Sequence, residues 1–121
     1  MLSHYIDVSV IQYSQIKMEQ ATRELITRGL ISKKVAEFET HVNENKSLIK
    51  SSKIVIFKFP DNYFCEQDEM FQLIKNIHMS YSELIKHNLI NKGFEVSSME
   101  YKDDYFNYAD CYVSKCVYLL K

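Results

Sequence analysis

Residues 53–62 read KIVIFKFPDN, and they contain the clearest strand signal in this 121-residue chain. The apolar run over 54–57 shows no alternation, which is typical of a strand that is covered on both faces. Pro60 lacks a backbone donor, and the Asp-Asn pair after it favours a turn. We therefore expect a strand over 53–59 in a central position of a sheet.

The segment before this strand, residues 14–50, carries apolar residues at helical spacing in two stripes. The first stripe runs from Met18 to Leu25, and the second begins at Ile31. The two stripes do not share a phase, and Gly29 lies between them. Because glycine is the residue best suited to end a helix, we expect either two helices or one helix kinked near Gly29.

The strongest helical pattern follows the strand, over residues 66–92, where apolar residues recur by threes and fours. Glu66, Asp68 and Glu69 would lie in its first turn, where acidic groups complement the helix dipole. Gly93 comes directly after the last turn, at the usual position of a helix-ending glycine. We therefore expect both glycines of the chain to end helices.

Three further segments have strand character. Residues 4–12 and 94–102 alternate apolar and polar side chains, and 111–120 is rich in Val, Tyr and Leu. The sequence DDYFNY over 103–108 predicts the connection of a hairpin. The order β-α-α-β-α-β-β predicts an α+β fold, with residues 1–121 as a single globular domain. In it, two or three helices pack on a mixed β-sheet of about four strands.

The composition excludes several classes of enzyme. Gly29 and Gly93 are the only glycines, and neither has a partner at the spacing of a phosphate-binding loop or a serine elbow. No C-x-x-C or H-E-x-x-H pair is present, which argues against a structural zinc site or a zincin centre. We expect no cofactor, no metal site and no catalytic residue of these kinds.

Two histidine positions require interpretation. Glu37, His41 and Glu44 lie at i, i+4 and i+7, so one helix could present all three to a cation, although a solvated flank explains them equally well. His78 follows Ile77 near the inner face of the long helix. We expect it to be a hydrogen-bonded histidine of the core or its boundary.

The expected compartment is the cytoplasm, without a membrane partner. The three cysteines are an odd number without the spacing of a disulfide framework, which favours reduced thiols. The first residues lack the basic start and apolar stretch of a secretory signal. No apolar run reaches the length of a membrane span.

One enzyme pattern is present as an alternative. Pro60-Asp61 ends one strand and Glu100-Tyr101-Lys102 ends another, which resembles the P-D…(D/E)-x-K set of restriction-endonuclease-like nucleases. The resemblance implies that Asp61 and Glu100 would bind Mg²⁺ and that Lys102 would help to activate or position water. The long helix between the two halves departs from the usual arrangement on neighbouring strands.

The leading hypothesis is a non-enzymatic protein-binding module whose C-terminal hairpin is acidic and aromatic. Tyr side chains are enriched among interface hot spots, and acidic side chains around them steer a basic partner. A natural role would be that of an inhibitor or immunity-type protein neutralising a basic protein. A solvated turn whose aromatic side chains fold onto the core explains the composition about as well. The expected partner-binding residues are Glu100, Tyr101, Asp103, Asp104, Tyr105, Phe106, Tyr108 and Asp110.

Two further alternatives involve the helices. Residues 14–58 carry nine Lys or Arg against five Glu, so the helices over 14–50 could bind nucleic acid without chemistry. The shortage of Arg disfavours this reading, since thirteen of the fifteen cations are Lys. A homodimer through the apolar stripe of helix 66–92 is the other alternative. The basic residues concerned are Arg23, Arg28, Lys33 and Lys34.

Overall fold

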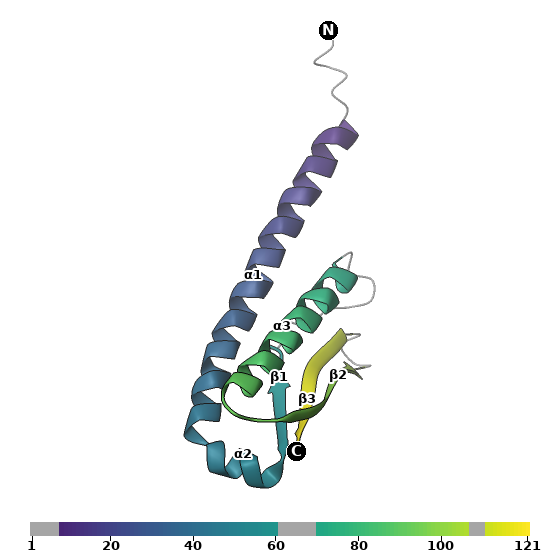
Figure 1. Ribbon diagram of the computed structural model, residues 1–121. Helices are drawn as coiled ribbons and strands as arrows, with labels where there is room; N and C mark the ends of the chain where they lie inside the picture. The colour runs from purple at the N-terminus through teal and green to yellow at the C-terminus, as the bar shows by residue number, and fades with distance from the viewer. Residues whose placement is uncertain (1–7, 61–69, 107–110) are drawn as a thin grey trace.

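A three-stranded antiparallel sheet lies beside the helices (Figure 1). The computed structural model describes residues 8–60, 70–106 and 111–121. The strands are β1 (Ile54–Lys58), β2 (Val96–Phe106) and β3 (Cys111–Leu120), in the order β1-β3-β2. The hairpin strand β3 is therefore central, and β1 and β2 lie at its two sides.

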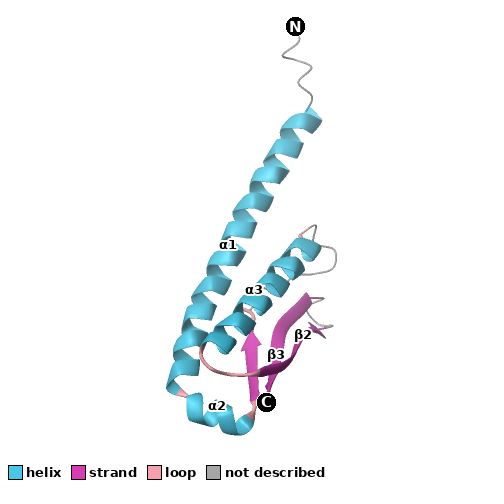
Figure 2. Cartoon of the chain, viewed as in Figure 1, coloured by secondary structure: helices cyan, strands magenta, loops and turns pink. Residues whose placement is uncertain are grey.

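Two long helices, α1 (Val8–Glu44) and α3 (Phe71–Asn91), lie side by side (Figure 2). The short helix α2 (Lys46–Ser52) turns the chain from α1 into β1. The N-terminal part of α1 extends well past the end of α3 (Figure 1). The result is an α+β domain of two layers, which confirms the expected fold class.

The core lies between the helices and one face of the sheet. Val55 and Phe57 of β1 are buried. The residues that alternate with them are exposed: Ile54, Ile56 and Lys58. Burying a large apolar side chain contributes about 1.5–3 kcal/mol, so this one-sided pattern fixes which face of each strand meets the helices. The helices and the hairpin complete the core with Ile31, Val35, Val42, Ile77, Ile85, Leu89, Cys116, Tyr118 and Leu120.

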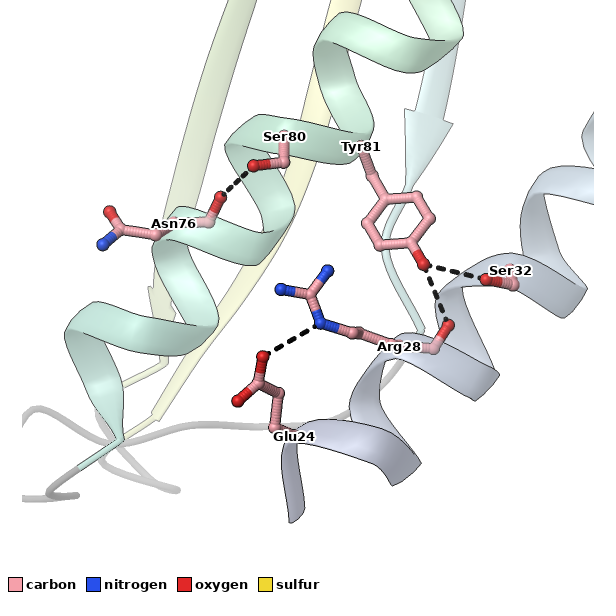
Figure 3. Close-up of polar contacts among 6 residues, drawn as sticks. All are labelled: Glu24, Arg28, Ser32, Asn76, Ser80 and Tyr81. Atoms are coloured by element: carbon pink, nitrogen blue, oxygen red, sulfur yellow. Dashed lines mark hydrogen bonds and ion pairs between the residues drawn. The ribbon is translucent and has the colours of Figure 1, made fainter. Parts of the chain in front are cut away.

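Polar contacts also join the two long helices (Figure 3). The hydroxyl of Tyr81 in α3 lies 2.8 Å from the Ser32 hydroxyl and donates to the Arg28 carbonyl at 3.4 Å. Nearer the other end of the helix pair, the Asn88 amide donates to the Glu39 carboxylate at 2.7 Å. These contacts set the rotation of α3 against α1 along the rim of the core.

The expected strand over residues 4–12 is wrong from residue 8 onward, because α1 begins at Val8. Residues 4–7 lie outside the described residues. Extending an existing helix by a turn avoids the cost of a new nucleus, so a short β-branched run can be drawn into a long helix. Alternation over so few residues does not exclude that outcome.

Of the two alternatives expected at Gly29, an end of the helix there is wrong, because α1 continues as one helix through Gly29 to Glu44. Met18 and Leu25 of the first apolar stripe are 70% and 72% exposed, so that stripe is not the packed face. The face toward the core instead runs in one phase through Thr27, Ile31, Val35, Phe38 and Val42. The apparent change of phase therefore reflects an exposed stripe beside a buried one, not a break.

The helical segment before β1 instead divides at Asn45, which separates α1 from α2. The Asn45 side-chain amide donates to the His41 carbonyl at 2.8 Å and so competes with the helical hydrogen bonds there. Lys53 then takes a left-handed conformation with φ of 59° and turns the chain into β1.

The strand over 53–59 is confirmed as β1, but its expected central position is wrong. β1 pairs only with β3 among the described residues, so it is an edge strand with one covered face. The three described strands are all antiparallel, where a mixed sheet of about four strands was expected. The crossover through α3 returns the chain to β2, which does not neighbour β1, so no parallel pair forms.

The other boundaries differ less from expectation. α3 begins at Phe71 rather than at residue 66, and the acidic residues expected in its first turn lie outside the described residues. Gly93 follows its last turn with φ of +93°, which confirms the helix-ending role. The hairpin is confirmed, but β2 continues to Phe106, so Asp103 and Asp104 are strand residues rather than turn residues.

Candidate functional site

The face of the sheet opposite the helices carries exposed apolar side chains, and we call it the outer sheet face. Ile54 and Leu119 lie directly opposite each other on β1 and β3, and Ile56 lies two residues along β1 from Ile54. These three side chains are 42%, 44% and 45% exposed, in the order Ile54, Leu119 and Ile56. Val117 lies opposite Ile56 and is half-buried. An apolar cluster on a sheet face that no described helix covers is typical of a contact surface.

Charged side chains border this cluster. The register places Lys58, Lys115 and Lys102 in one row across the three strands. Glu100 lies 3.7 Å from Lys102, and Asp104 lies 3.7 Å from Lys115. Such exposed ion pairs contribute little to stability, so a partner can exchange them for its own charges. An apolar centre with a polar rim is the usual anatomy of a protein interface.

The inner face of the hairpin holds a chain of polar groups beneath α3. The Tyr101 hydroxyl donates to Ser114 at 2.8 Å, and Ser114 donates to Asp103 at 2.6 Å. Lys75 of α3 forms an ion pair with the other Asp103 oxygen at 2.8 Å. His78 Nδ1 lies 3.0 Å from the Tyr101 hydroxyl at the opposite end of this chain.

Burial sets the charge state of His78. The Tyr101 hydroxyl gives its hydrogen to Ser114, so its oxygen can accept a hydrogen bond from His78 Nδ1. Burial lowers the pKa of His78 to about 4, although the Asp103 charge opposes this shift. The imidazole is therefore neutral at physiological pH. Its ring stacks on Phe59, with centroids 4.1 Å apart.

The other groups of the chain are held in fixed charge states. Burial raises the pKa of Tyr101, so its hydroxyl stays protonated. Burial would raise the pKa of Asp103, but the hydrogen bonds from Lys75 and Ser114 outweigh it and lower that pKa. His78 and Ser114 are each 2% exposed. These buried groups join α3 to the hairpin.

This geometry divides the residues expected to bind a partner. Glu100 and Asp104 lie on the outer sheet face, whereas Tyr101 and Asp103 point inward and belong to the buried polar chain. Alternation along β2 produces this division. The side chains of Tyr105 and Phe106, and the residues Tyr108 and Asp110, lie outside the described part of the chain.

The nuclease set is only partly described. Glu100 and Lys102 share the outer sheet face and contact each other, as their spacing predicts. Asp61 lies outside the described residues. Within residues 18–60, 70–104 and 113–121, no group of three His, Cys, Asp or Glu side chains is arranged to hold a metal ion. This statement includes Glu37, His41 and Glu44.

The basic residues of α1 do not form one free surface. Arg28 forms an ion pair with Glu24 at 3.1 Å (Figure 3), and Arg23 is half-buried. Lys33 and Lys34 are exposed further along the helix. This arrangement gives little support to binding of nucleic acid along α1.

The apolar stripe of α3 belongs largely to the core. Ile74, Ile77, Ile85 and Leu89 are buried, so the seam expected to serve a homodimer already packs within the chain. Leu84 is exposed on the same helix. A dimer through α3 would therefore have to use its outer flank.

Sequence reasoning missed Ile54, Ile56 and Leu119 as candidate contact residues. An apolar run without alternation predicts two covered faces, whereas the strand over 54–58 has one covered face and one exposed face. The signal that could have found them is the shortness of the run, because four apolar residues between Lys53 and Lys58 suit an edge strand.

Comparison with known proteins finds no matching family model, no matching curated protein and no matching solved structure. Among the described residues, no helix is both long enough and apolar enough to cross a membrane.

Proposed function

We propose that this chain is a non-catalytic protein-binding module that docks a partner protein on its outer sheet face. The observation that carries the proposal is the exposure of Ile54, Ile56 and Leu119 in adjacent positions on a sheet face that neither long helix covers. An exposed apolar cluster costs solubility, so a partner that covers it explains its presence.

The finer form of the proposal is an inhibitor or immunity-type protein that neutralises a basic partner. Glu100 and Asp104 support it, because both acids lie on the same face as the apolar cluster. Lys58, Lys102 and Lys115 oppose it by adding positive charge to that face. The apolar cluster therefore supplies most of the expected affinity, and the acids select the partner.

Capture from cells that produce the chain tests the docking surface. The wild-type chain is compared with the double variant Ile54→Thr and Leu119→Thr, and bound proteins are quantified side by side. A matched control, Leu25→Thr with Leu48→Thr, removes exposed apolar side chains elsewhere on the molecule. We expect the same partner with wild type and control and its loss from the outer-face variant. Equal recovery with all three would contradict the proposal.

The choice of a basic partner is tested with the double variant Glu100→Lys and Asp104→Lys. Its association with the captured partner should slow, and the dependence of that rate on salt should weaken. Asp103 is left unchanged because it belongs to the buried polar chain. An unchanged association rate would contradict a basic partner, but it would not contradict docking on the outer sheet face.

A further inference from the structure

A groove of about 310 Å³ lies between α1 and β1. Ile56 and Phe57 both line it, although one side chain is exposed on the outer sheet face and the other is buried on the inner face. A groove that touches both must lie along the edge of the strand. Helix α1 forms the opposite wall. The lining residues are Lys34, Glu37, Phe38, His41, Ile56, Phe57 and Lys58.

The backbone of β1 directs unpaired groups into this groove. Leu120 donates to the Lys53 carbonyl, and Phe59 donates to the Ser114 carbonyl, so the odd-numbered residues of β1 pair with β3. In an antiparallel ladder the residues between them point the other way. The N–H and C=O groups of Ile54, Ile56 and Lys58 therefore face the free edge, where no described strand pairs with them.

We propose that this groove binds an extended, acidic and apolar peptide segment of a partner protein, which pairs with β1 as a fourth strand. This inference deepens the proposed function and rests on it, since it names how the partner docks. A free strand edge is a template for such pairing. β1 spans about 17 Å, so about five residues of the peptide would run along it.

The walls of the groove favour acidic and apolar side chains on that segment. Phe38 and Phe57 meet edge to face with centroids 5.4 Å apart and supply an apolar floor. Lys34 and Lys58 line the groove against the single acid Glu37, and neither lysine has an ion pair among the described residues. Side chains of an added strand alternate in direction, so the peptide can meet the floor and the lysines at successive positions.

A second copy of the chain suits this groove less well than an acidic segment. Pairing of β1 with β1 of another copy would bring a second Lys34 and a second Lys58 to the same groove. Like charges in close contact oppose association. The charge of the groove therefore favours a segment from a different protein.

A phage-displayed library of linear seven-residue peptides tests the edge directly. We expect enrichment of sequences that combine acidic with apolar residues. The binding of the enriched peptides is then compared for Ile56→Pro and Ile56→Thr. Proline removes the N–H that faces the groove while leaving the pairs with β3, whereas threonine keeps this N–H and makes the side chain polar.

The variants Ile56→Pro and Ile56→Thr test this inference separately from the proposed function. Weakening of at least about tenfold with proline and less than about threefold with threonine supports pairing with the strand edge. Equal loss with both variants, equal binding with both, or no enriched peptide would overturn it. Docking on the outer sheet face is judged separately, with the Ile54→Thr and Leu119→Thr variant.

A charge test covers the case in which the proline variant fails to fold. The exposed double variant Lys34→Glu and Lys58→Glu should reverse the selection, so that the library yields basic rather than acidic peptides. Unchanged selection would overturn the inference. Analytical ultracentrifugation adds one further outcome: a wild-type dimer that becomes monomeric with Ile56→Pro would also overturn it, because a second copy would then fill the groove.

Discussion

At the scale of single residues, the buried polar chain beneath α3 explains why two residues expected to bind a partner make contacts within the protein instead. Tyr101 and Asp103 are held by Ser114, Lys75 and His78, and each donor meets an acceptor. Buried polar groups are costly only when unpaired. Tyr101 and Asp103 therefore do not belong to the partner-binding surface. They attach the hairpin to α3 instead.

The Tyr101 hydroxyl should contribute more to stability than a comparable hydroxyl at the rim. Tyr101→Phe removes the hydroxyl that joins His78 Nδ1 to Ser114 and leaves Ser114 only its bond to Asp103, so we expect a loss of about 1–3 kcal/mol in the free energy of unfolding. Tyr81→Phe removes a hydroxyl that bonds at the exposed junction of α1 and α3, and should cost about 1 kcal/mol or less. Urea unfolding measures both. Equal losses would contradict the assignment of the polar chain to the core.

His78 should make stability depend on pH. Its folded pKa of about 4 lies below the ordinary value of 6.5, so its contribution is fully present above pH 6.5. As the pH falls below 6.5, His78 becomes protonated in the unfolded chain but stays neutral in the folded chain. Stability therefore falls until about pH 4. Between about pH 7.5 and 5 the expected loss is about 2 kcal/mol.

Urea unfolding at the two pH values measures this loss, and two variants assign it. His78→Gln should remove most of the dependence on pH in this window. His87→Gln, at an exposed position of the same helix, should keep it. If the dependence of stability on pH remains in His78→Gln and disappears in His87→Gln, the neutral buried imidazole is not the source of that dependence.

At the scale of elements, the two glycines should respond in opposite directions to the same substitution. Gly29 lies inside α1, and a Cβ added there meets nothing within 4 Å. Gly29→Ala should therefore raise the free energy of unfolding by about 1 kcal/mol. Gly93 also has open space around it, but its φ of +93° strains any other residue, so Gly93→Ala should lower stability by about 1 kcal/mol or more.

Thermal or urea unfolding of the two alanine variants decides between a continuous helix and a break. If Gly29 ended a helix in a left-handed conformation, alanine would destabilise the chain at both positions. Destabilisation by Gly29→Ala would therefore contradict the course of α1.

The sequence predicts those elements whose signal is local. The apolar run of β1, the periodicity of α3 and the C′ position of Gly93 depend on neighbours in the chain, and each expectation is confirmed. The position of β1 at the edge depends on which strand pairs with it, and pairing between distant segments leaves no local pattern. The course of α1 through Gly29 likewise depends on packing against α3, which overrides a weak local preference.

The same limit applies to the candidate site. Alternation along β2 could separate Glu100 and Asp104 from Tyr101 and Asp103 once the strand is known to continue past residue 102. The sequence alone placed its end too early, because DDYFNY has the composition of a turn. The outer sheet face could not be predicted at all, since it follows from both helices packing on one side.

At the scale of the whole molecule, the sheet has one face in the core and one face that no described helix covers. This asymmetry follows from the number of layers, because two helices can cover one face of a three-stranded sheet but not both. The apolar side chains of β1 and β3 on this face are only about half buried, so they contribute less to folding than the side chains of the core. Their replacement with threonine should change the free energy of unfolding by no more than about 0.5 kcal/mol for each residue.

The dissociation constant of the purified partner, measured by calorimetry, tests the central claim most directly. It is compared for the wild-type chain, the outer-face variant Ile54→Thr with Leu119→Thr, and the control Leu25→Thr with Leu48→Thr. Loss of two apolar contacts of about 1 kcal/mol each predicts about thirtyfold weaker binding for the outer-face variant, with the control equal to wild type. Equal dissociation constants for wild type and the outer-face variant would contradict docking on the outer sheet face.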